Sequence, residues 1–212
     1  MGKLVVIPRP TIERLPLYLH SLTQLDQSGV EVVSSEELGR ILGITSVQIR
    51  KDLAYFGEFG RRGVGYDVSD LMQQITEILG VNRPNKIAIV GAGHLGQALA
   101  RYEGFNEYGF MLAAIFDNDP EKIGTEVAGQ QVLSADYITE VVKSLGIKIG
   151  IVTVPATAAQ KVADQLLAAG VRAIWNFAPT RIEAPIEVEV RQENLSVGLL
   201  ALSYHLAQEK RS

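Results

Sequence analysis

A short glycine-rich run, Gly91-Ala92-Gly93-His94-Leu95-Gly96, separates an apolar strand pattern from a helical pattern. The strand pattern covers residues 86–90, and the helical pattern covers residues 97–102. Glycines placed in this way let a strand turn tightly into a helix whose amino end faces phosphate groups. We therefore expect all six residues of the run to hold the pyrophosphate of a dinucleotide.

The three glycines of the run are expected to have different roles. Gly91 allows the tight turn, Gly93 lets the backbone approach the pyrophosphate, and Gly96 permits close packing of the helix on the strand. Asp117 ends the second strand pattern, 21 residues after Gly96. A carboxylate there accepts hydrogen bonds from the ribose hydroxyls and repels a 2′-phosphate, which favours NAD over NADP. The alternative is an ordinary turn residue ahead of residues 118–120.

Strand and helix patterns alternate after the glycine-rich run. We expect strands at residues 87–90, 111–116, 131–133, 147–154, 173–176 and 188–190, and helices at 97–102, 135–145 and 156–169. This alternation predicts an α/β fold, a Rossmann-like doubly wound parallel sheet whose ligand lies at the carboxyl ends of the strands. Residues that follow two of the strands are further candidates for the cofactor site, with ordinary loop structure as the alternative: Thr153, Val154, Pro155, Asn176, Phe177 and Ala178.

About 85 residues precede the first of these strands, and their patterns are helical. Residues 11–28 carry an apolar stripe in which Pro16 is tolerated if it lies in or near the first turn. The stripe consists of Ile12, Leu15, Leu19, Leu22 and Leu25. Ser34 and Glu37 form a capping box that opens a short helix, which Gly43 ends. Thr45 and Gln48 form a second capping box directly afterwards.

Two short capped helices joined by a glycine-containing turn are typical of a helix-turn-helix, whose second helix reads DNA. Four apolar residues of this second helix are expected to face inward: Val47, Ile49, Leu53 and Phe56. The glycine-rich segment 57–66 follows and is predicted to form a β-hairpin wing with Arg61 and Arg62 at its tip. The candidate DNA-binding residues are Ser46, Gln48, Arg50, Lys51, Tyr55, Arg61, Arg62 and Gly63.

Within this set, Arg50 and Lys51 could reach base edges or backbone in the major groove, and the wing arginines suit the minor groove or flanking phosphates. Tyr55 is expected to touch a phosphate. The alternative is a small helical dimerisation domain whose charges form a solvated face. Asp52 and Glu58 favour that alternative, because they dilute the basic patch.

The charge balance carries no global sign of a nucleic-acid partner. The chain has a net charge of −4, with ten basic and ten acidic residues up to Lys86 and ten and fourteen after it. Any DNA binding must therefore come from a local basic patch. The absence of cysteine excludes disulfides and thiolate zinc sites, and the three histidines lack metal-ligand spacing, so no metal site is predicted. We find neither a membrane span nor a signal peptide, and we expect a soluble, cytoplasmic protein.

Composition predicts where the domains meet. A third capped helix, 69–79, leads into a polar segment with a proline, which gives a winged-helix domain at 1–80, a linker at 81–85 and a Rossmann NAD(H)-binding domain at 86–193. Residues 194–212 contain an apolar helix that is too hydrophobic to lie in solvent. We expect it to mediate dimerisation, because a two-fold partner supplies the paired reading heads that palindromic DNA requires.

A dehydrogenase would need a positioned acid or base near the nicotinamide, and the chain offers no convincing set. Tyr102 is the nearest candidate, and packing is its expected role. No catalytic residue is predicted, and the nucleotide domain is expected to sense rather than react. The alternatives are a small NAD-dependent oxidoreductase with an accessory N-terminal domain and a nucleotide-binding interaction module similar to CoA-binding domains.

The chain resembles the Rex family of redox-sensing transcriptional repressors, and the most specific match is the string at residues 50–57, Arg-Lys-Asp-Leu-Ala-Tyr-Phe-Gly. Further matches are residues 14–19, 48–49, 63–66, 91–96 and 176–179. The resemblance implies a homodimer that binds double-stranded operator DNA through winged helices and leaves it when NADH replaces NAD⁺. It also implies a C-terminal helix swapped between subunits.

The resemblance further implies that Arg50, Lys51 and the wing arginines contact DNA, that the glycine turn and Asp117 contact NAD(H), and that Tyr102 lies near the nicotinamide. Two positions depart from the family's pattern. The family commonly has an arginine where this chain has His20, and an acidic residue where it has Asn194. A charged contact between domains is therefore weakened or replaced in this chain.

Overall fold

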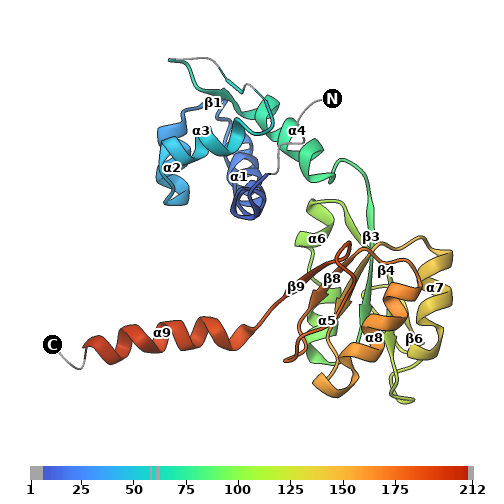
Figure 1. Ribbon diagram of the computed structural model, residues 1–212. Coiled ribbons are helices and arrows are strands. Elements are labelled where there is room, and N and C mark those ends of the chain that lie inside the picture. The colour runs from blue at the N-terminus through green and yellow to red at the C-terminus, as the bar shows by residue number, and fades with distance from the viewer. Residues whose placement is uncertain (1–6, 58, 61–62, 210–212) are drawn as a thin grey trace. The chain divides into compact units, whose positions relative to one another are not determined.

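The computed structural model describes residues 7–57, 59–60 and 63–209, and the chain divides into two compact units that meet between Arg83 and Pro84 (Figure 1). The first unit contains four helices and a short two-stranded sheet among its described residues. In chain order these are α1 (Arg9–Gln27), β1 (Val32–Val33), α2 (Ser35–Leu42), α3 (Ser46–Leu53), β2 (Tyr66–Asp67) and α4 (Val68–Leu79).

Apolar side chains from all four helices form the core of the first unit. Its fully buried members include Leu15, Tyr18, Leu22, Leu38, Ile49, Leu53, Leu71 and Ile75. The predicted capping box of α2 is present, because the Ser34 side chain accepts from the Glu37 backbone N–H and the Glu37 carboxylate accepts from the Ser34 backbone N–H. Gly43 ends α2 in the left-handed conformation, with φ of 67°. Local capping signals thus set both ends of this helix.

Several sequence expectations for the first unit are wrong in detail. Val47 was expected to face inward but is 66% exposed, and Ile12, the first member of the apolar stripe in α1, is 48% exposed. Pro16 lies inside α1, well beyond its first turn. The expected second capping box is half formed: Thr45 accepts from the Gln48 N–H, but the Gln48 side chain bonds elsewhere. Helix α4 is capped by Asp67 and begins at Val68.

The predicted wing segment, residues 57–66, ends where strand β2 begins at Tyr66. Strand β2 pairs antiparallel with β1, which lies ahead of α2 in the chain. Val32 is opposite Asp67, and Val33 is opposite Tyr66. The wing arginines Arg61 and Arg62, together with Glu58, lie outside the described residues.

The second unit contains a seven-stranded sheet. Its strands are β3 (Asn85–Val90), β4 (Phe110–Asp117), β5 (Glu126–Val127), β6 (Gln130–Ser134), β7 (Ile149–Val152), β8 (Ala173–Asn176) and β9 (Glu189–Gln192). The order across the sheet is β5-β6-β4-β3-β7-β8-β9, and every neighbouring pair is parallel except β5 with β6. The chain proceeds outward from β3 in one direction and then returns to β7 on its other side. The predicted Rossmann-like, doubly wound α/β fold is confirmed, with one short antiparallel edge strand added.

Helices cover the two faces of this sheet unequally. One face packs on α7 (Ile138–Ser144), which follows the 3-10 turn η1 (Ala135–Tyr137), and on α8 (Ala156–Ala168). The other face packs on two shorter helices, α5 (His94–Ala100) and α6 (Gly104–Glu107). Aromatic rings extend the second layer: Phe105 lies edge-on to Trp175, whose ring is 4.7 Å from that of Phe177.

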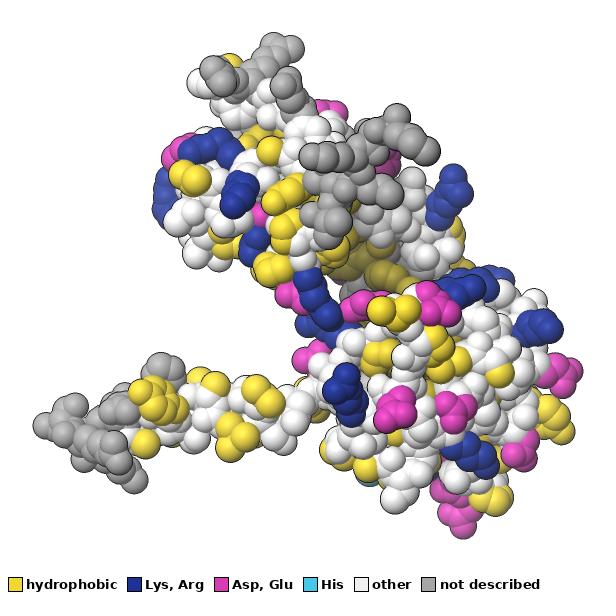
Figure 2. All heavy atoms as spheres, viewed as in Figure 1, with side chains coloured by type: hydrophobic (Ala, Val, Ile, Leu, Met, Phe, Trp, Pro, Cys, Tyr) yellow, Lys and Arg dark blue, Asp and Glu magenta, His cyan; other side chains and the backbone are white. Residues whose placement is uncertain are grey.

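The last helix, α9 (Leu195–Glu209), presents apolar side chains to solvent (Figure 2). Its described large apolar residues are all more than half exposed: Leu195, Val197, Leu199, Leu200, Leu202, Tyr204 and Leu206. Burial of such surface contributes about 25 cal/mol per Å², so the helix has a strong drive to find a partner. In the part of the chain that the structure describes, no helix is long and apolar enough to cross a membrane.

Candidate functional site

The glycine turn joins β3 to α5 at the carboxyl edge of the sheet. Gly91 has a φ of +107°, a backbone conformation that residues other than glycine rarely adopt. A Cβ on Gly96 would lie 1.8 Å from the Gly91 carbonyl oxygen, whereas a Cβ on Gly93 would meet nothing within 4 Å. Helix α5 begins at His94, three residues earlier than expected. Gly96 is thus required for close packing, and Gly93 leaves open space above the turn.

Thr153, the residue directly after the neighbouring strand β7, braces the glycine turn. Its hydroxyl donates to the carbonyl oxygens of Val90 and Gly91, at 3.0 and 2.8 Å. The backbone N–H of Thr153 also donates to the Val90 carbonyl, at 2.9 Å. This predicted site residue therefore fixes the turn and at the same time lies on the wall of the cleft described next.

A cleft of about 820 Å³ opens where β3, β4 and β7 end. This is the crevice at which the strand order reverses, the usual ligand position in doubly wound sheets. Six of the predicted residues line it: Gly91, Gly93, Asp117, Thr153, Val154 and Pro155. The cleft also contains residues that sequence reasoning missed, chiefly Lys122, Lys161 and Gln165. Lys161 and Gln165 are four residues apart on α8, so they lie on the same face of that helix. Because the helix directly follows the predicted residues Thr153, Val154 and Pro155, this spacing could have identified both residues from the sequence.

Asp117 links the glycine turn to this cleft. Its Oδ2 accepts from the Ala92 backbone N–H at 2.7 Å, and its Oδ1 accepts from the Asp119 N–H at 2.9 Å. The Lys122 ammonium lies 3.4 Å from Oδ2. Burial alone would raise the pKa of Asp117, but these backbone N–H groups and Lys122 lower it overall. The carboxylate is therefore charged near neutrality at the edge of the cleft.

The other strand-end candidates lie away from the cleft. Asn176 is fully buried, and its Nδ2 donates to the Thr180 carbonyl and to Gln192 Oε1 at 2.8 and 2.6 Å. Its Oδ1 accepts from the backbone N–H of Ala178, which is also buried. Phe177 packs beside Trp175. These contacts hold the loop after β8 together.

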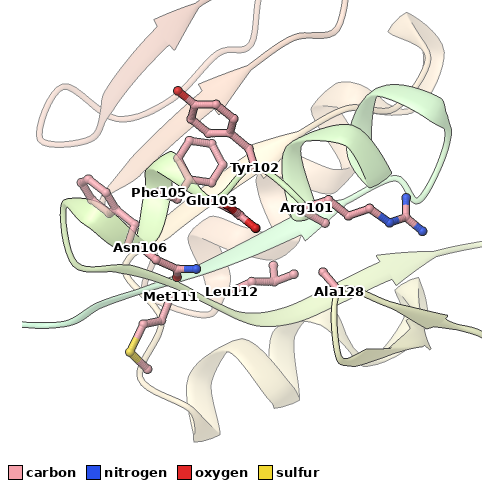
Figure 3. A pocket seen from close by; sticks show the side chains of 10 residues that line it. Arg101, Tyr102, Glu103, Phe105, Asn106, Met111, Leu112 and Ala128 are labelled. Atoms are coloured by element: carbon pink, nitrogen blue, oxygen red, sulfur yellow. The ribbon is translucent and has the colours of Figure 1, made fainter.

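Tyr102 lies on a separate pocket of about 490 Å³ beside α5 and α6 (Figure 3). The tyrosine is 59% exposed, and its ring meets that of Phe105 edge-on at 5.1 Å. Met111, Leu112 and Ala128 line the other side of this pocket, at the start of β4 and at the β5–β6 turn. Tyr102 thus packs on Phe105 while more than half of the residue stays exposed.

On the recognition-helix candidate α3, two predicted DNA contacts already have partners. The Arg50 guanidinium donates to Ser35 Oγ at 2.6 Å and to Glu36 Oε1 at 3.0 Å, both at the start of α2. Gln48 Nε2 donates to Asp52 Oδ1 at 2.8 Å. Lys51 and Gly63 are exposed, and Ser46 and Tyr55 are half-buried. The exposed cations of α3 therefore remain accessible, while Arg50 has an acidic neighbour.

Asp52 was expected to dilute the basic patch, and this is wrong because its side chain is fully buried between α1 and α3. Its carboxylate accepts five hydrogen bonds from four side chains: Thr11, Arg14 (through two nitrogens), Tyr18 and Gln48. Burial raises the pKa of Asp52, but the hydrogen bonds from Arg14, Tyr18, Gln48 and Thr11 outweigh it and lower the pKa to about 2. Asp52 is a charged brace inside the unit.

Comparison with known proteins covers both units. Residues 6–54 match the family described as putative DNA-binding protein N-terminus, and residues 82–180 match the CoA binding domain family. Redox-sensing transcriptional repressors Rex are similar over the whole chain: that of Roseiflexus sp. (strain RS-1) is 48% identical, over 100% of this chain and 96% of the relative. That of Desulfitobacterium hafniense is 47% identical, over 98% of this chain and 99% of the relative.

Solved structures of a Rex-family repressor named RSP are also similar. The crystal structure of RSP in complex with β-NAD⁺ and operator DNA has a TM-score of 0.92 and 38% identity, and the match covers 97% of this chain and 95% of that one. The complex of RSP with β-NADH has a TM-score of 0.88 at 38% identity, over 98% of this chain and 97% of that one.

Proposed function

The chain belongs to the Rex family of redox-sensing transcriptional repressors, and from this we infer that it binds palindromic operator DNA as a homodimer and is released when NADH binds. One observation carries the proposal: a helix-turn-helix pair and a dinucleotide-type cleft occur in one chain whose full length matches a repressor bound to β-NAD⁺ and operator DNA. The oxidoreductase alternative is not favoured, since the relatives are repressors. A repressor acts where the DNA is, which in a bacterial cell is the cytoplasm.

We assign NAD(H) to the cleft at the end of β3, β4 and β7. The open space over Gly93 suits a pyrophosphate, and the charged Asp117 carboxylate suits ribose hydroxyls. Lys122, which pairs with Asp117, and Lys161 supply positive charge in the same cleft. Phe177 and Tyr102, with the residues around Asn176, are proposed for the nicotinamide half, where the family resemblance places Tyr102. The nucleotide domain is proposed to extend over residues 86–193.

We assign the operator contacts to residues 1–80, which the linker 81–85 joins to the nucleotide domain. Helix α3 presents Ser46 and Gln48 in its first turn and Arg50 and Lys51 in its last turn, and Tyr55 follows the helix. Gly63 and the wing arginines Arg61 and Arg62 complete the surface. The buried position of Asp52 supports this assignment. Because Asp52 points into the unit, its carboxylate does not lie beside Arg50 and Lys51 on the exposed face of α3.

The dimer is proposed to form through residues 194–212. The exposed apolar side chains of α9 support this role, and a swap of this helix between subunits would cover them. The face of the sheet that carries only α5 and α6 offers further apolar surface within the same unit. A two-fold dimer presents two recognition helices to the two halves of a palindrome.

The redox response is proposed to arise from linkage. NADH and operator favour different arrangements of the dimer, so each weakens the binding of the other by the same factor. NAD⁺ differs from NADH by a positive charge on the nicotinamide ring. A ring site that excludes water and lacks a carboxylate partner favours the neutral, reduced form, because burial of an unpaired charge is costly.

The decisive experiment is a gel shift on a palindromic operator with NADH or NAD⁺ added. We expect the protein to shift the operator alone and with NAD⁺, and we expect NADH to release it. Calorimetry of the free protein should give tighter binding of NADH than of NAD⁺. Equal affinities would remove the charge argument, and the absence of any shift would exclude the repressor. Steady hydride transfer to a small carbonyl substrate would favour the oxidoreductase instead.

A further inference from the structure

The side-chain donors around Asp52 come from two sides. Thr11, Arg14 and Tyr18 all lie on α1, and Gln48 lies in the first turn of α3, one turn ahead of Asp52 itself. Gln48 is thus the member of this network that belongs to the amino end of the recognition-helix candidate. Residues at that end of a recognition helix are the ones that reach base edges in the major groove.

The Asp52 carboxylate determines how the Gln48 amide is oriented. An ionised carboxylate accepts hydrogen bonds and cannot donate them. The amide therefore turns Nε2 toward Asp52, at 2.8 Å from Oδ1, and directs Oε1 away from it. The opposite orientation would set a carbonyl oxygen against a buried negative charge. One N–H of Nε2 is used in this contact, and the other remains beside Oε1.

The Gln48 amide therefore keeps two groups for another partner, the Oε1 acceptor and the second N–H of Nε2 beside it. In the major groove adenine presents the complementary pair, the N6 amino group as donor and N7 as acceptor. We propose that Gln48 is a specificity-determining residue that reads one adenine in each half of the operator, and that Asp52 is the positioning residue that orients its amide. The inference rests on the proposed DNA-binding function.

The test uses duplexes in which a single functional group of one base is removed. The full-length protein without NADH first selects operators from a pool of random palindromic duplexes. Each adenine of the selected operator is then replaced in turn by purine, which lacks the N6 amino group. For the unmodified protein we expect one adenine per half-site at which affinity falls by about five- to 150-fold, the range of one good bidentate base contact.

The Gln48→Met variant identifies the partner of that adenine. Methionine keeps the length of the side chain without its polar atoms, so this variant should bind the adenine and purine operators equally. The matched control is Gln74→Met on α4, because Gln74 Nε2 donates to Asp70 Oδ2 at 2.7 Å in a similar glutamine–aspartate pair. The control should retain the full dependence on adenine. Gln48→Met that weakens every duplex equally would overturn the proposal.

Two measurements test the role of Asp52. The Asp52→Asn variant should lose the preference for that adenine while its affinity for a scrambled duplex stays unchanged, a pattern that general loss of folding cannot produce. If this variant does not fold, hydrogen exchange of the side-chain amides in the unmodified protein decides: one Gln48 proton should exchange more slowly than those of Gln74. Equal exchange would overturn the orientation. A full-length protein that enriches no duplex would instead overturn the proposed function.

Discussion

The two units each bury one carboxylate among their described residues, and they use it differently. Asp52 in the first unit is fully enclosed and accepts five hydrogen bonds from the side chains of two helices. Asp117 in the second unit is 7% exposed, accepts from two backbone N–H groups and lies on the wall of a cleft. A carboxylate that is satisfied by side chains braces a fold, whereas one held by backbone at an opening is available to a ligand.

Removal of the cation beside Asp52 should have the largest effect. In Arg14→Met, the carboxylate loses the two shortest nitrogen donors and remains buried without a counter-charge. We expect the first unit to lose about 3–5 kcal/mol of unfolding free energy. Urea unfolding followed by circular dichroism measures this loss.

The control is Arg9→Met, which removes an exposed pair with Glu13 from the same helix. It should change stability by less than about 1 kcal/mol. Equal losses for the two variants would mean that Asp52 is not a brace, and the contrast between the two carboxylates would disappear.

Substitutions in the glycine turn separate packing from ligand binding in the second unit. Gly96→Ala sets a methyl group against the Gly91 carbonyl oxygen and should lower the free energy of unfolding by about 1–3 kcal/mol. The same substitution should also weaken NADH binding. Gly93→Ala meets open space, so stability should be kept while NADH binding weakens. Thermal unfolding and NADH titration of both variants check this. Normal NADH binding by Gly93→Ala would argue against a pyrophosphate at the turn.

Acid should weaken the first unit through Asp52. The pKa of Asp52 is lowered from 3.8 to about 2 in the folded state, so its stabilising contribution is complete above pH 3.8 and is lost as the pH falls toward 2. The loss should amount to about 2 kcal/mol. Urea midpoints measured from pH 5 to pH 2 would reveal it, and Asp52→Asn should flatten the profile. An unchanged slope in that variant would assign acid sensitivity to other groups.

The smallest effect is expected at the exposed pair between Arg50 and Glu36. Glu36→Gln leaves the Ser35 contact of Arg50 in place and removes a negative charge from the start of α2. Operator affinity at low salt should rise about two- to five-fold, and added salt should erase the gain. A gel-shift titration at two salt concentrations tests this. A fall in affinity would show that Glu36 holds Arg50 in its reading position.

Local signals predicted much of both units. The Ser34–Glu37 box and Gly43 set the ends of α2, and the glycine turn with its flanking strand set the position of the cleft. These features need only neighbours in the chain. The alternation of strands and helices likewise predicted that β3, β4, β6, β7 and β8 run parallel in one sheet.

Long-range contacts explain what the sequence could not reveal. From the sequence alone Asp52 was interpreted as an exposed charge, because its partners Tyr18, Arg14 and Thr11 lie 34, 38 and 41 residues earlier in the chain. The pairing of β2 with β1 also spans α2 and α3, so the local sequence pattern could not reveal it. Val47 fits an apolar stripe, but a helix as short as α3 buries only Ile49 and Leu53 of that stripe fully.

The single tryptophan of the chain gives the second unit an optical readout. The ring of Trp175, near the end of β8, lies beside that of Phe177 at a tilt of 50°, and its Nε1 donates to Glu193 just ahead of α9. Indole emission overlaps the absorption band of reduced nicotinamide, and the oxidised ring lacks that band. Energy transfer from Trp175 would therefore distinguish the two redox forms of the nucleotide without any label. A movement of the residues just ahead of α9 would alter the same emission through the Glu193 hydrogen bond. One fluorescence spectrum could therefore follow both nucleotide binding and movement of α9.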